Sequence, residues 1–288
     1  MKAYVVDAFT CDGQGGNPAG VVLVNEVLPK ERMQAIAARL GFSETAFVVF
    51  SGTSRHKIRF FTPENEVALC GHATIASYFL LFHLGQIQAG PFVMETLAGE
   101  QAVSVDTTGS VGMTQNLPVF GSTLRGSDVA PALGMAPELI GGPTGLPIQI
   151  ASTGLNKIFV PVVSLEALHE IKPDFERIAR ISEANDSIGM YCYCLETIRG
   201  STAHCRNFAP VVGIREDSAT GTSAAALGCV LHHYGIIDPV LTERLVFEQG
   251  FCIQQPSEIH VLLKITEGAI TRVEIAGRAS LREVCLVP

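Results

Sequence analysis

Residues 66–87, EVALCGHATIASYFLLFHLGQI, recur 150 positions later as residues 216–237, EDSATGTSAAALGCVLHHYGII, with seven of the 22 aligned positions identical. Chance at ordinary composition would give about one or two identities. Upstream, RFFTP at 59–63 matches RNFAP at 206–210 after a three-residue shift. Because the period is much too long for a solenoid, the sequence predicts two copies of one domain.

Each copy contains a stretch that predicts a buried helix behind a glycine. The predicted helices cover residues 72–84 and 222–234, directly after Gly71 and Gly221. Each is closed by a glycine fourteen residues after its opening glycine, as a C-terminal glycine cap would do. Both helices are apolar nearly all round, and a helix with no polar face must be enclosed on every side. We therefore expect each half to wrap its strands around a central helix.

Short apolar runs separated by Gly, Pro and Asn indicate more strands than helices. Two further helices are expected at residues 30–40, ending at Gly41, and at about 174–181. The expected strands are AYVVDAF (3–9), GVVLV (20–24), AFVVF (46–50), KIRFF (57–61), QAVSVD (101–106), KIFVPVV (157–163), YCYCL (191–195), EIHVLL (258–263) and RVEIAG (272–277).

The domain organisation follows from the repeat. We predict the α+β class, with two similar domains, each a mostly antiparallel, barrel-like sheet around a central helix. The first domain is placed at residues 1–117, completed by 278–288, and the second at residues 118–277.

The composition excludes several classes of protein. Hydrophobic residues make up 47% of the 288 residues and charged residues 17%, which excludes a disordered chain. The 20 Lys and Arg against 28 Asp and Glu give a net charge of -8 without a basic patch. Nucleic acid and membrane surfaces are therefore not expected as partners.

The N-terminus and the cysteines predict the cellular compartment of the protein. The first ten residues, MKAYVVDAFT, lack the apolar core of a secretory signal, which predicts a cytoplasmic protein. Residues 67–94 carry no Asp, Glu, Lys or Arg, but His, Gln, Gly and Pro interrupt them. They predict a buried core element rather than a bilayer span. The eight cysteines form no CxxC pair and are expected to be reduced, mostly buried thiols.

The two glycine-led helices predict a binding site for an anion. The first N–H groups of a helix and the positive end of its dipole can hold a carboxylate or a phosphate. If a pseudo-twofold axis relates the domains, the helices that begin at Gly71 and Gly221 point at one interdomain cleft. A small anionic substrate is the expected occupant. The alternative is that both glycines only permit tight packing.

Four strings, in register along nearly the whole chain, resemble the phenazine-biosynthesis (PhzF-like) isomerase family. They are GNPAG (16–20), SETAF (43–47), FFTPENEVALCGHAT (60–74) and EDSATGTSA (216–224). The resemblance implies the two-lobed fold of diaminopimelate epimerase and proline racemase, with a helix inside each barrel-like domain. It also implies cofactor-free proton transfer.

The resemblance assigns the acid/base role to Glu44 of SETAF. This role is chemically reasonable, because desolvation in an apolar cleft disfavours a charged carboxylate and lets it both take and return a proton. His72 resembles the histidine that helps to hold the substrate, and Asp217 the aspartate that orients His72 or a polar group of the substrate. The residues alone allow a simpler interpretation of each. Glu44 would be a capping or surface carboxylate, His72 a histidine at the start of a helix, and Asp217 an acid at a helix N-terminus.

Further binding residues are carried over in the same way. Gly71 and Gly221 match the glycines whose amides face the substrate carboxylate, and Asn17 lies in a turn that approaches the cleft in this fold.

Three positions depart from the family pattern. Thr222 replaces the motif serine and keeps its hydroxyl, while its added methyl group narrows the pocket. Ser218 stands where relatives have proline, and Gln255 stands where they often have arginine. Together these departures argue against the phenazine substrate itself.

Cys70 suggests an alternative base. The related racemases use two thiolates, and the repeat places Thr220 opposite Cys70, although an alcohol is far less acidic than a thiol. A two-thiol racemase is therefore not expected, but a Cys/Thr pair resembles hydroxyproline dehydratases. The simpler interpretation of Cys70 is a small buried hydrophobic residue.

Neither a metal nor a cofactor is expected. CDGQGGNPAG at 11–20 lacks the ending of a phosphate loop and predicts a turn between strands. Six cysteines and histidines of the second half also lack the spacing of a zinc site. They are Cys192, Cys194, His204, Cys205, His232 and His233.

Three hypotheses follow. The first is a cofactor-independent isomerase that moves a proton on a small carboxylic acid through Glu44. The second is a Cys70-based epimerase or dehydratase of an amino or imino acid. The third is a non-catalytic binding or regulatory protein on the same scaffold. The low charge and high apolar content also leave room for a homodimer like those of the family.

Overall fold

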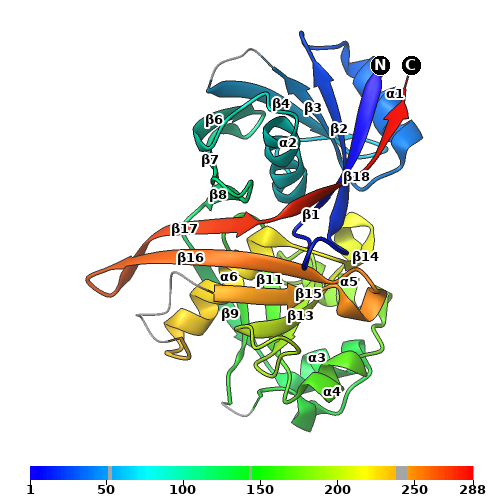
Figure 1. Ribbon diagram of the computed structural model, residues 1–288. Coiled ribbons are helices and arrows are strands. Elements are labelled where there is room, and N and C mark those ends of the chain that lie inside the picture. Colours follow the sequence, from blue (N-terminus) through cyan, green and yellow to red (C-terminus); the bar gives the residue numbers. More distant parts are fainter. Residues whose placement is uncertain (51–53, 143–144, 238–244, 288) are drawn as a thin grey trace. The chain divides into compact units, whose positions relative to one another are not determined.

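The computed structural model mixes helices and paired strands in two compact units (Figure 1). Unit 1 comprises Met1–Thr114 and Ala276–Pro288, and unit 2 comprises Gln115–Ile275. The residues that the structure describes are 1–50, 54–142, 145–237 and 245–287.

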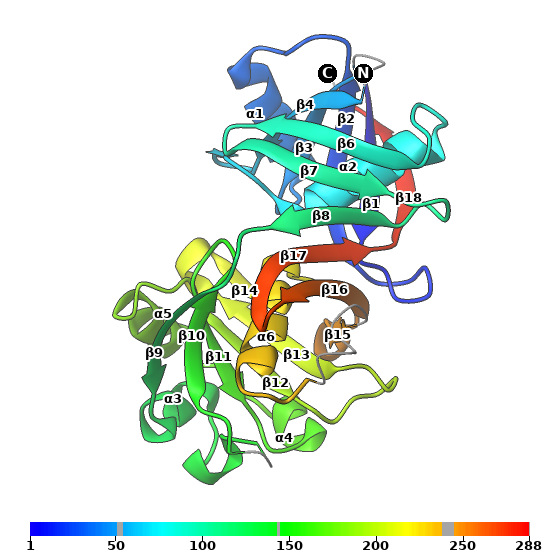
Figure 2. The ribbon, with the colours of Figure 1, turned by 90° about the vertical axis from the view of Figure 1, so that its left-hand side faces the viewer.

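Unit 1 contains a run of paired strands with two helices. The strands are β1 (Lys2–Ala8), β2 (Asn17–Val24), β3 (Thr45–Val49), β4 (Arg55–Phe61), β5 (Glu66–Val67), β6 (Gly90–Thr96), β7 (Gly99–Val105), β8 (Val111–Gln115) and β18 (Ala279–Leu286); the helices are α1 (Lys30–Leu40) and α2 (Gly71–His83). They pair in the order β18-β1-β2-β3-β4-β6-β7-β8, and the segment β6-β7-β8 can be followed in Figure 2. The pairs β2–β3 and β4–β6 are parallel, and the others are antiparallel.

Unit 2 contains a second run of paired strands. The strands are β9 (Val119–Leu124), β10 (Ile148–Ser152), β11 (Lys157–Pro161), β12 (Met190–Cys194), β13 (Ala203–Ala209), β14 (Ile214–Asp217), β15 (Leu245–Gln249), β16 (Ser257–Thr266) and β17 (Ala269–Gly277). The helices are α3 (Gly126–Leu133), α4 (Leu165–His169), α5 (Phe175–Glu183) and α6 (Gly221–His233), with short 3-10 turns at Pro137–Leu139, Pro210–Val212 and Phe251–Ile253. The strands pair in the order β9-β10-β11-β12-β13-β15-β16.

The two units follow the same pattern of pairing. From β1–β2 to β6–β7 the pairs run antiparallel, parallel, antiparallel, parallel and antiparallel, and the same succession runs from β10–β11 to β15–β16. In each unit a short antiparallel strand, β5 on β4 or β14 on β13, leads into a buried helix. The residues that recur in the sequence therefore occupy equivalent places in the two units.

The helices α2 and α6 are enclosed by their own units. They begin at Gly71 and Gly221, and Gly85 and Gly235 follow them in the left-handed conformation at φ 67° and 68°. Helix α2 packs on β1, β2, β3 and β18, whereas α6 packs on β10 and β16. Both helices are buried along most of their length, as their apolar circumference predicts.

A matching arginine–glutamate pair holds β5 and β14 in place. Arg59 donates two hydrogen bonds to Glu66, both at 2.6 Å, and Arg206 donates two to Glu216 at 2.9 and 2.8 Å. Each guanidinium also lies over a phenylalanine ring two residues further along its own strand. Bidentate, partly buried pairs of this kind fix geometry as well as adding stability.

The helices predicted at 30–40 and about 174–181 are confirmed as α1 and α5. Helix α1 buries Met33, Ile36 and Ala37 on one face, and Gly41 ends it at φ 71°. A strand is present at each of the nine predicted places, with ends that differ from the prediction by up to three residues. The turn predicted at 11–20 is present as far as Gly16, after which β2 begins.

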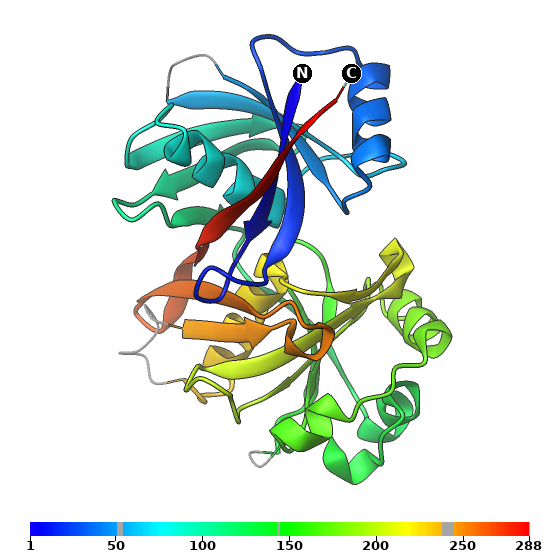
Figure 3. The same ribbon diagram turned by 45° about the vertical axis from the view of Figure 1, so that its right-hand side comes forward.

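The two chain ends meet in unit 1 (Figure 3). The Met1 amino group donates to the Val287 carbonyl at 2.5 Å, and the Val287 N–H donates to the Met1 carbonyl at 2.9 Å. The C-terminal strand β18 pairs with β1 along its length, so the last residues belong to the same unit as the first.

The eight cysteines are free thiols and six of them are buried, as predicted. No helix in the described part of the chain has the length and apolar character needed to cross a bilayer.

Candidate active site

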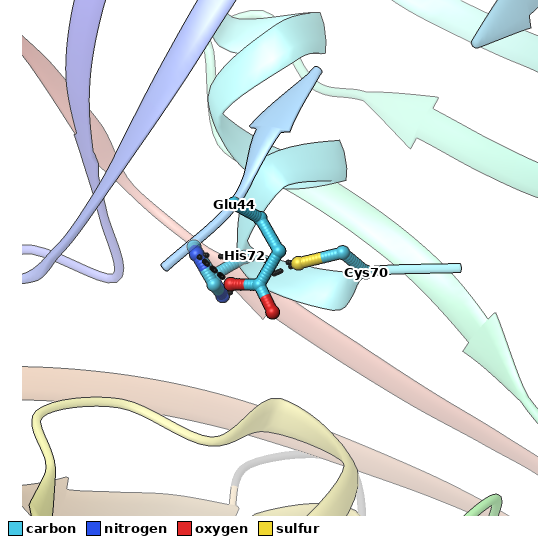
Figure 4. Close-up of side chains that lie close together, drawn as sticks. All are labelled: Glu44, Cys70 and His72. Carbon is cyan, nitrogen blue, oxygen red and sulfur yellow. Dashed lines mark hydrogen bonds and ion pairs between the residues drawn. The ribbon is translucent and has the colours of Figure 1, made fainter. Parts of the chain in front are cut away.

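Three side chains predicted from different motifs lie together in unit 1 (Figure 4). Glu44 precedes β3, Cys70 is the N-cap of α2, and His72 is the second residue of that helix. A carboxylate oxygen, the thiol sulfur and a ring nitrogen all lie within 4.8 Å of one another.

The imidazole of His72 lies between the other groups. Its Nε2 lies 3.3 Å from Glu44 Oε2 and 3.4 Å from Ser43 Oγ, while its Nδ1 lies 3.4 Å from Cys70 Sγ. The two ring nitrogens of His72 therefore contact a carboxylate, a hydroxyl group and a thiol. A neutral imidazole donates through one nitrogen and accepts through the other, so it can relay or hold a proton here.

Glu44 is held at its backbone but left open at its side chain. Its carbonyl accepts a hydrogen bond from the Gly20 N–H at 3.1 Å, which fixes the segment against β2. Its Oε2 is buried and has no hydrogen-bond partner in the described part of the chain. Because buried polar atoms are nearly always satisfied, a buried carboxylate oxygen that makes no hydrogen bond needs an explanation, and contact with a ligand is one.

The N-terminus of α2 offers an anion-binding site next to this cluster. Cys70 has extended backbone angles and provides no side-chain cap, and the first turn carries no acidic residue. The first intrahelical bond within the described residues at this end runs from the Thr74 N–H to the Cys70 carbonyl. The N–H groups ahead of it and the helix dipole favour a bound negative charge.

Asp217 lies in a separate hydrogen-bonded cluster in unit 2. Thr220 Oγ1 donates to Asp217 Oδ2 at 2.5 Å and accepts from Asn207 Nδ2 at 2.7 Å and from Gln249 Nε2 at 3.1 Å. Gln249 also accepts from the Tyr191 hydroxyl and from the Thr220 N–H, at 2.9 and 3.2 Å. The Asp217 carboxylate is therefore oriented by a chain of hydrogen bonds that ends in buried residues.

We expect Thr220→Val to lower the free energy of unfolding by about 1–3 kcal/mol, because Asn207, Gln249 and Asp217 each lose a partner. Thr220→Ser keeps the hydroxyl group and should retain most of the stability. Urea denaturation of both variants measures the difference. A loss in Thr220→Ser without one in Thr220→Val would show that the methyl group, not the hydroxyl group, stabilises this cluster.

The helix α6 begins beside this cluster as α2 begins beside His72. Its N-cap is Thr220, which again provides no side-chain cap, and no acidic residue lies in the first turn. Gly221 is buried, and the carbonyl of Thr222 accepts a hydrogen bond from Thr153 Oγ1 at 3.0 Å. The repeat therefore places Cys70 and Thr220 at equivalent helix N-caps.

A tight turn supports the segment that carries Asp217. Gly250 has φ 82°, and a Cβ atom there would lie 2.1 Å from the Gln255 carbonyl oxygen and 2.7 Å from the Ser218 carbonyl oxygen. Both are backbone atoms, so moving either one would distort the chain at a cost in free energy. Gly213 has a similar φ of 78°, but nothing lies within 4 Å of its Cβ position.

Gly250→Ala should therefore destabilise the protein by about 1–3 kcal/mol more than Gly213→Ala. Both variants carry the same left-handed strain of about 1–2 kcal/mol, so their difference isolates the backbone collision. Thermal unfolding of the two proteins is the measurement. Equal melting temperatures for Gly250→Ala and Gly213→Ala would show that the Ser218 segment is less rigid than its contacts indicate.

Lys157 is a buried charged residue, close enough to Asp217 to interact with its charge, that the sequence analysis did not single out. It begins β11, is 2% exposed, and its Nζ has no hydrogen-bond partner in the described part of the chain. Burial lowers the pKa of Lys157 to about 8, and the negative charge of Asp217 opposes that decrease. Lys157 is the first residue of the predicted strand KIFVPVV (157–163), and no local sequence signal indicates that the end of this strand is buried.

The other predicted residues have these places. Asn17 is buried at the start of β2, opposite Ala8. Gln255 follows a 3-10 turn and donates its N–H to the Gly250 carbonyl. Among the described residues, only Glu44, Cys70 and His72 bring three metal-ligating atoms within 4.8 Å of one another.

Comparison with known proteins relates the whole chain to one family. The model of the family described as phenazine biosynthesis-like protein (PhzC-PhzF) matches residues 6–283. An uncharacterized isomerase of Deinococcus radiodurans is 34% identical over 98% of this chain and 93% of its own length. The trans-2,3-dihydro-3-hydroxyanthranilate isomerase of Pseudomonas fluorescens is 29% identical over 96% of each chain. A PhzF-family crystal structure from Bacillus anthracis covers 100% of this chain and 99% of its own, with a TM-score of 0.86 and 29% identity.

Proposed function

The chain belongs to the phenazine biosynthesis-like (PhzC-PhzF) family and is an isomerase, and we propose that it moves a proton on a small carboxylic acid, without a cofactor, through Glu44. The observation that carries this proposal is the buried Oε2 of Glu44, which makes no hydrogen bond in the described part of the chain and lies 3.3 Å from His72 Nε2. That the relatives are named isomerases also supports a catalytic role over a passive binding role.

Glu44 is the group best placed to exchange a proton with a substrate. Its Oε2 makes no hydrogen bond within the described residues and has the His72 ring beside it, which leaves room for a substrate C–H group. A positioned carboxylate in a largely enclosed site is an effective general base and, once protonated, a general acid. The nearby His72 Nε2, at 3.3 Å, holds the carboxyl group in place or receives a hydrogen bond from the substrate.

The proposed step is a proton shift that needs no oxidant. The Glu44 carboxylate takes a proton from one carbon, and the electron pair of that C–H bond enters the adjacent π system of the substrate. The carboxylic acid then returns the proton to a different carbon, where a new C–H bond forms. Substrate and product have the same composition, and Glu44 ends in its starting state.

The N-terminus of α2 is the proposed anchor for the substrate carboxylate. It lies one residue from His72, has no side-chain cap and has no acidic residue in its first turn. Backbone N–H groups and the helix dipole then bind the carboxylate and orient the reacting carbon. The name of the Pseudomonas fluorescens relative is that of an enzyme acting on a hydroxylated cyclic carboxylate, which supports this class of substrate.

We also assign roles to residues of unit 2 and of β2. Gly221 and Thr222 open α6, whose N-terminus has the same uncapped form as that of α2. We assign them, with Asn17, to substrate binding and Asp217 to a supporting polar role. The matching order of strand pairs supports two similar domains, each with a sheet around its central helix.

An NMR screen in D2O tests the proposed function. Small unsaturated, amino and hydroxy cyclic carboxylates, with trans-2,3-dihydro-3-hydroxyanthranilate among them, are incubated with the wild-type protein. We expect deuterium to enter a carbon position of at least one carboxylate, or that carboxylate to be isomerised. Turnover confined to the corresponding carboxamides or esters would contradict a carboxylate anchor, and no exchange in any compound would contradict the activity.

A further inference from the structure

We propose that Glu44, Cys70 and His72 also form a binding site for zinc, and that the bound cation blocks proton transfer by Glu44. The binding does not depend on the proposed function, whereas the inhibition rests on it. The motif spacing did not reveal this site, because Glu44 lies 26 residues before Cys70 in the chain.

The spacing of the three donor atoms is close to that of a tetrahedral zinc site. With ordinary Zn–S, Zn–N and Zn–O bonds, tetrahedral geometry places nitrogen and oxygen ligands about 3.3 Å apart, and nitrogen and sulfur ligands about 3.6 Å apart. In the structure His72 Nε2 lies 3.3 Å from Glu44 Oε2 and 4.0 Å from Cys70 Sγ. The nitrogen–oxygen spacing therefore matches, whereas the sulfur atom has to move closer for all three atoms to bind one ion.

The chemistry of the set also favours zinc. Histidine, cysteine and glutamate are three of the ligand types that Zn²⁺ uses, and the thiolate selects it over the hard cations magnesium and calcium. A thiolate and a carboxylate together carry two negative charges, so the complex with Zn²⁺ is neutral. The desolvation penalty for burying a neutral complex is smaller than that for burying separate charges.

The site remains accessible and leaves one coordination position open. The side chains of His72 and Glu44 are 11% and 17% exposed, so the site borders on solvent although Glu44 Oε2 itself is covered. Ser43 Oγ, at 3.4 Å from His72 Nε2, is placed to hydrogen-bond a water molecule in the fourth position. Binding occupies the Glu44 oxygen that the proposed reaction needs, which is why we expect inhibition.

The proton balance gives an independent signature. Cysteine binds the metal as thiolate, so each zinc ion that displaces the Cys70 proton releases one proton to solvent. Nothing is oxidised or reduced. Titration in buffers of different ionisation enthalpy measures that release directly.

Cobalt substitution is the deciding experiment. Co²⁺ is added to the metal-free, fully reduced protein, and the thiolate-to-cobalt charge-transfer band and the visible bands of tetrahedral Co²⁺ are recorded; Zn²⁺ is then added to displace the Co²⁺. We expect both sets of bands in the wild type, and at least about a 100-fold weaker affinity in Cys70→Ser and His72→Asn, because direct ligands matter more than their supporting contacts. Cys252→Ala is the matched control, since it removes an exposed thiol from another part of the chain, and should bind Co²⁺ like the wild type.

Two results would overturn the proposal. One is the absence of the charge-transfer band in the wild type, and the other is its persistence in Cys70→Ser when circular dichroism shows both proteins to be folded. Zinc binding without inhibition of the isomerase would refute the blocking of Glu44 while leaving the site itself established. Failure of the proposed function would instead show as absent deuterium exchange in metal-free protein, so the two failures are distinguishable.

Discussion

Glu44→Gln should lower kcat of the metal-free isomerase by about 10²–10⁴-fold, the usual contribution of a positioned general acid–base group. The amide has nearly the shape of the carboxyl group and can still contact His72 Nε2, but it cannot accept a proton from carbon at neutral pH. Because the substrate anchor at α2 is untouched, KM should change much less than kcat. Steady-state kinetics on a substrate found by the D2O screen measure both constants.

Glu64→Gln is the matched control for this variant. Glu64 is exposed, lies in the same unit and carries the same charge, so its replacement changes the net charge equally without touching the cluster. We expect wild-type kinetics from it. If both glutamine variants lost activity equally, the effect would be one of overall charge, and if neither did, Glu44 would not be the proton-transferring group.

The largest effect on stability is expected from Glu248→Gln. Glu248 and His204 are register partners on the parallel strands β15 and β13, and both side chains are enclosed. His204 Nδ1 lies 2.8 Å from Glu248 Oε2, and the N–H groups of Ile198 and Arg199 donate to the same carboxylate at 2.9 and 2.8 Å. A glutamine supplies one oxygen instead of two and turns an NH2 group toward a donor. Breaking such a buried pair costs about 3–5 kcal/mol.

The same contacts give this contribution a defined pH dependence. The hydrogen bonds from His204, Ile198 and Arg199 outweigh the cost of burial and lower the pKa of Glu248 from 4.5 to about 2. A carboxyl group whose pKa is lower in the folded state stabilises the protein fully above its unfolded pKa. The difference in stability between wild type and Glu248→Gln should therefore be constant above about pH 5 and shrink as the pH falls from 4.5 toward 2.

A neighbouring glutamate–histidine pair provides the control. Glu258 and His260 lie on β16 with a 2.7 Å contact, but their side chains are 28% and 49% exposed. Exposed ion pairs contribute about 0–1 kcal/mol, so Glu258→Gln should unfold at nearly the wild-type urea concentration. A loss in Glu248→Gln no larger than that in Glu258→Gln would show that the buried pair does not stabilise unit 2.

Much of the fold could be predicted because its signals are local. The helices α2 and α6 follow from an apolar run between two glycines, and α1 from a periodic run that ends at Gly41. Helix α3 was not predicted, because Pro131 within it reads as a helix breaker and its eight residues give a weak pattern. Helix α4 has only five residues and depends on the Ser164 cap, which is too short a signal to separate from a turn.

The candidate site could be predicted only in part, for a different reason. Glu44 and His72 were found through resemblance to family motifs, since neither residue has a distinctive local pattern. The buried partners Lys157, Gln249 and the His204–Glu248 pair are created by strand register between segments far apart in the chain. A sequence shows such residues as ordinary polar members of strands. The pairing of β13 with β15 brings Gln249 and the His204–Glu248 pair into the interior, and Lys157 is buried at the start of β11.

The central claim is that Glu44 transfers a proton between carbon and solvent or between two carbons of a small carboxylate. It is tested most directly by NMR in D2O, with metal-free wild type and Glu44→Gln side by side on the same substrate. We expect deuterium at a carbon position with the wild type, and exchange slowed at least about 100-fold with Glu44→Gln. Exchange by Glu44→Gln at the wild-type rate would contradict it.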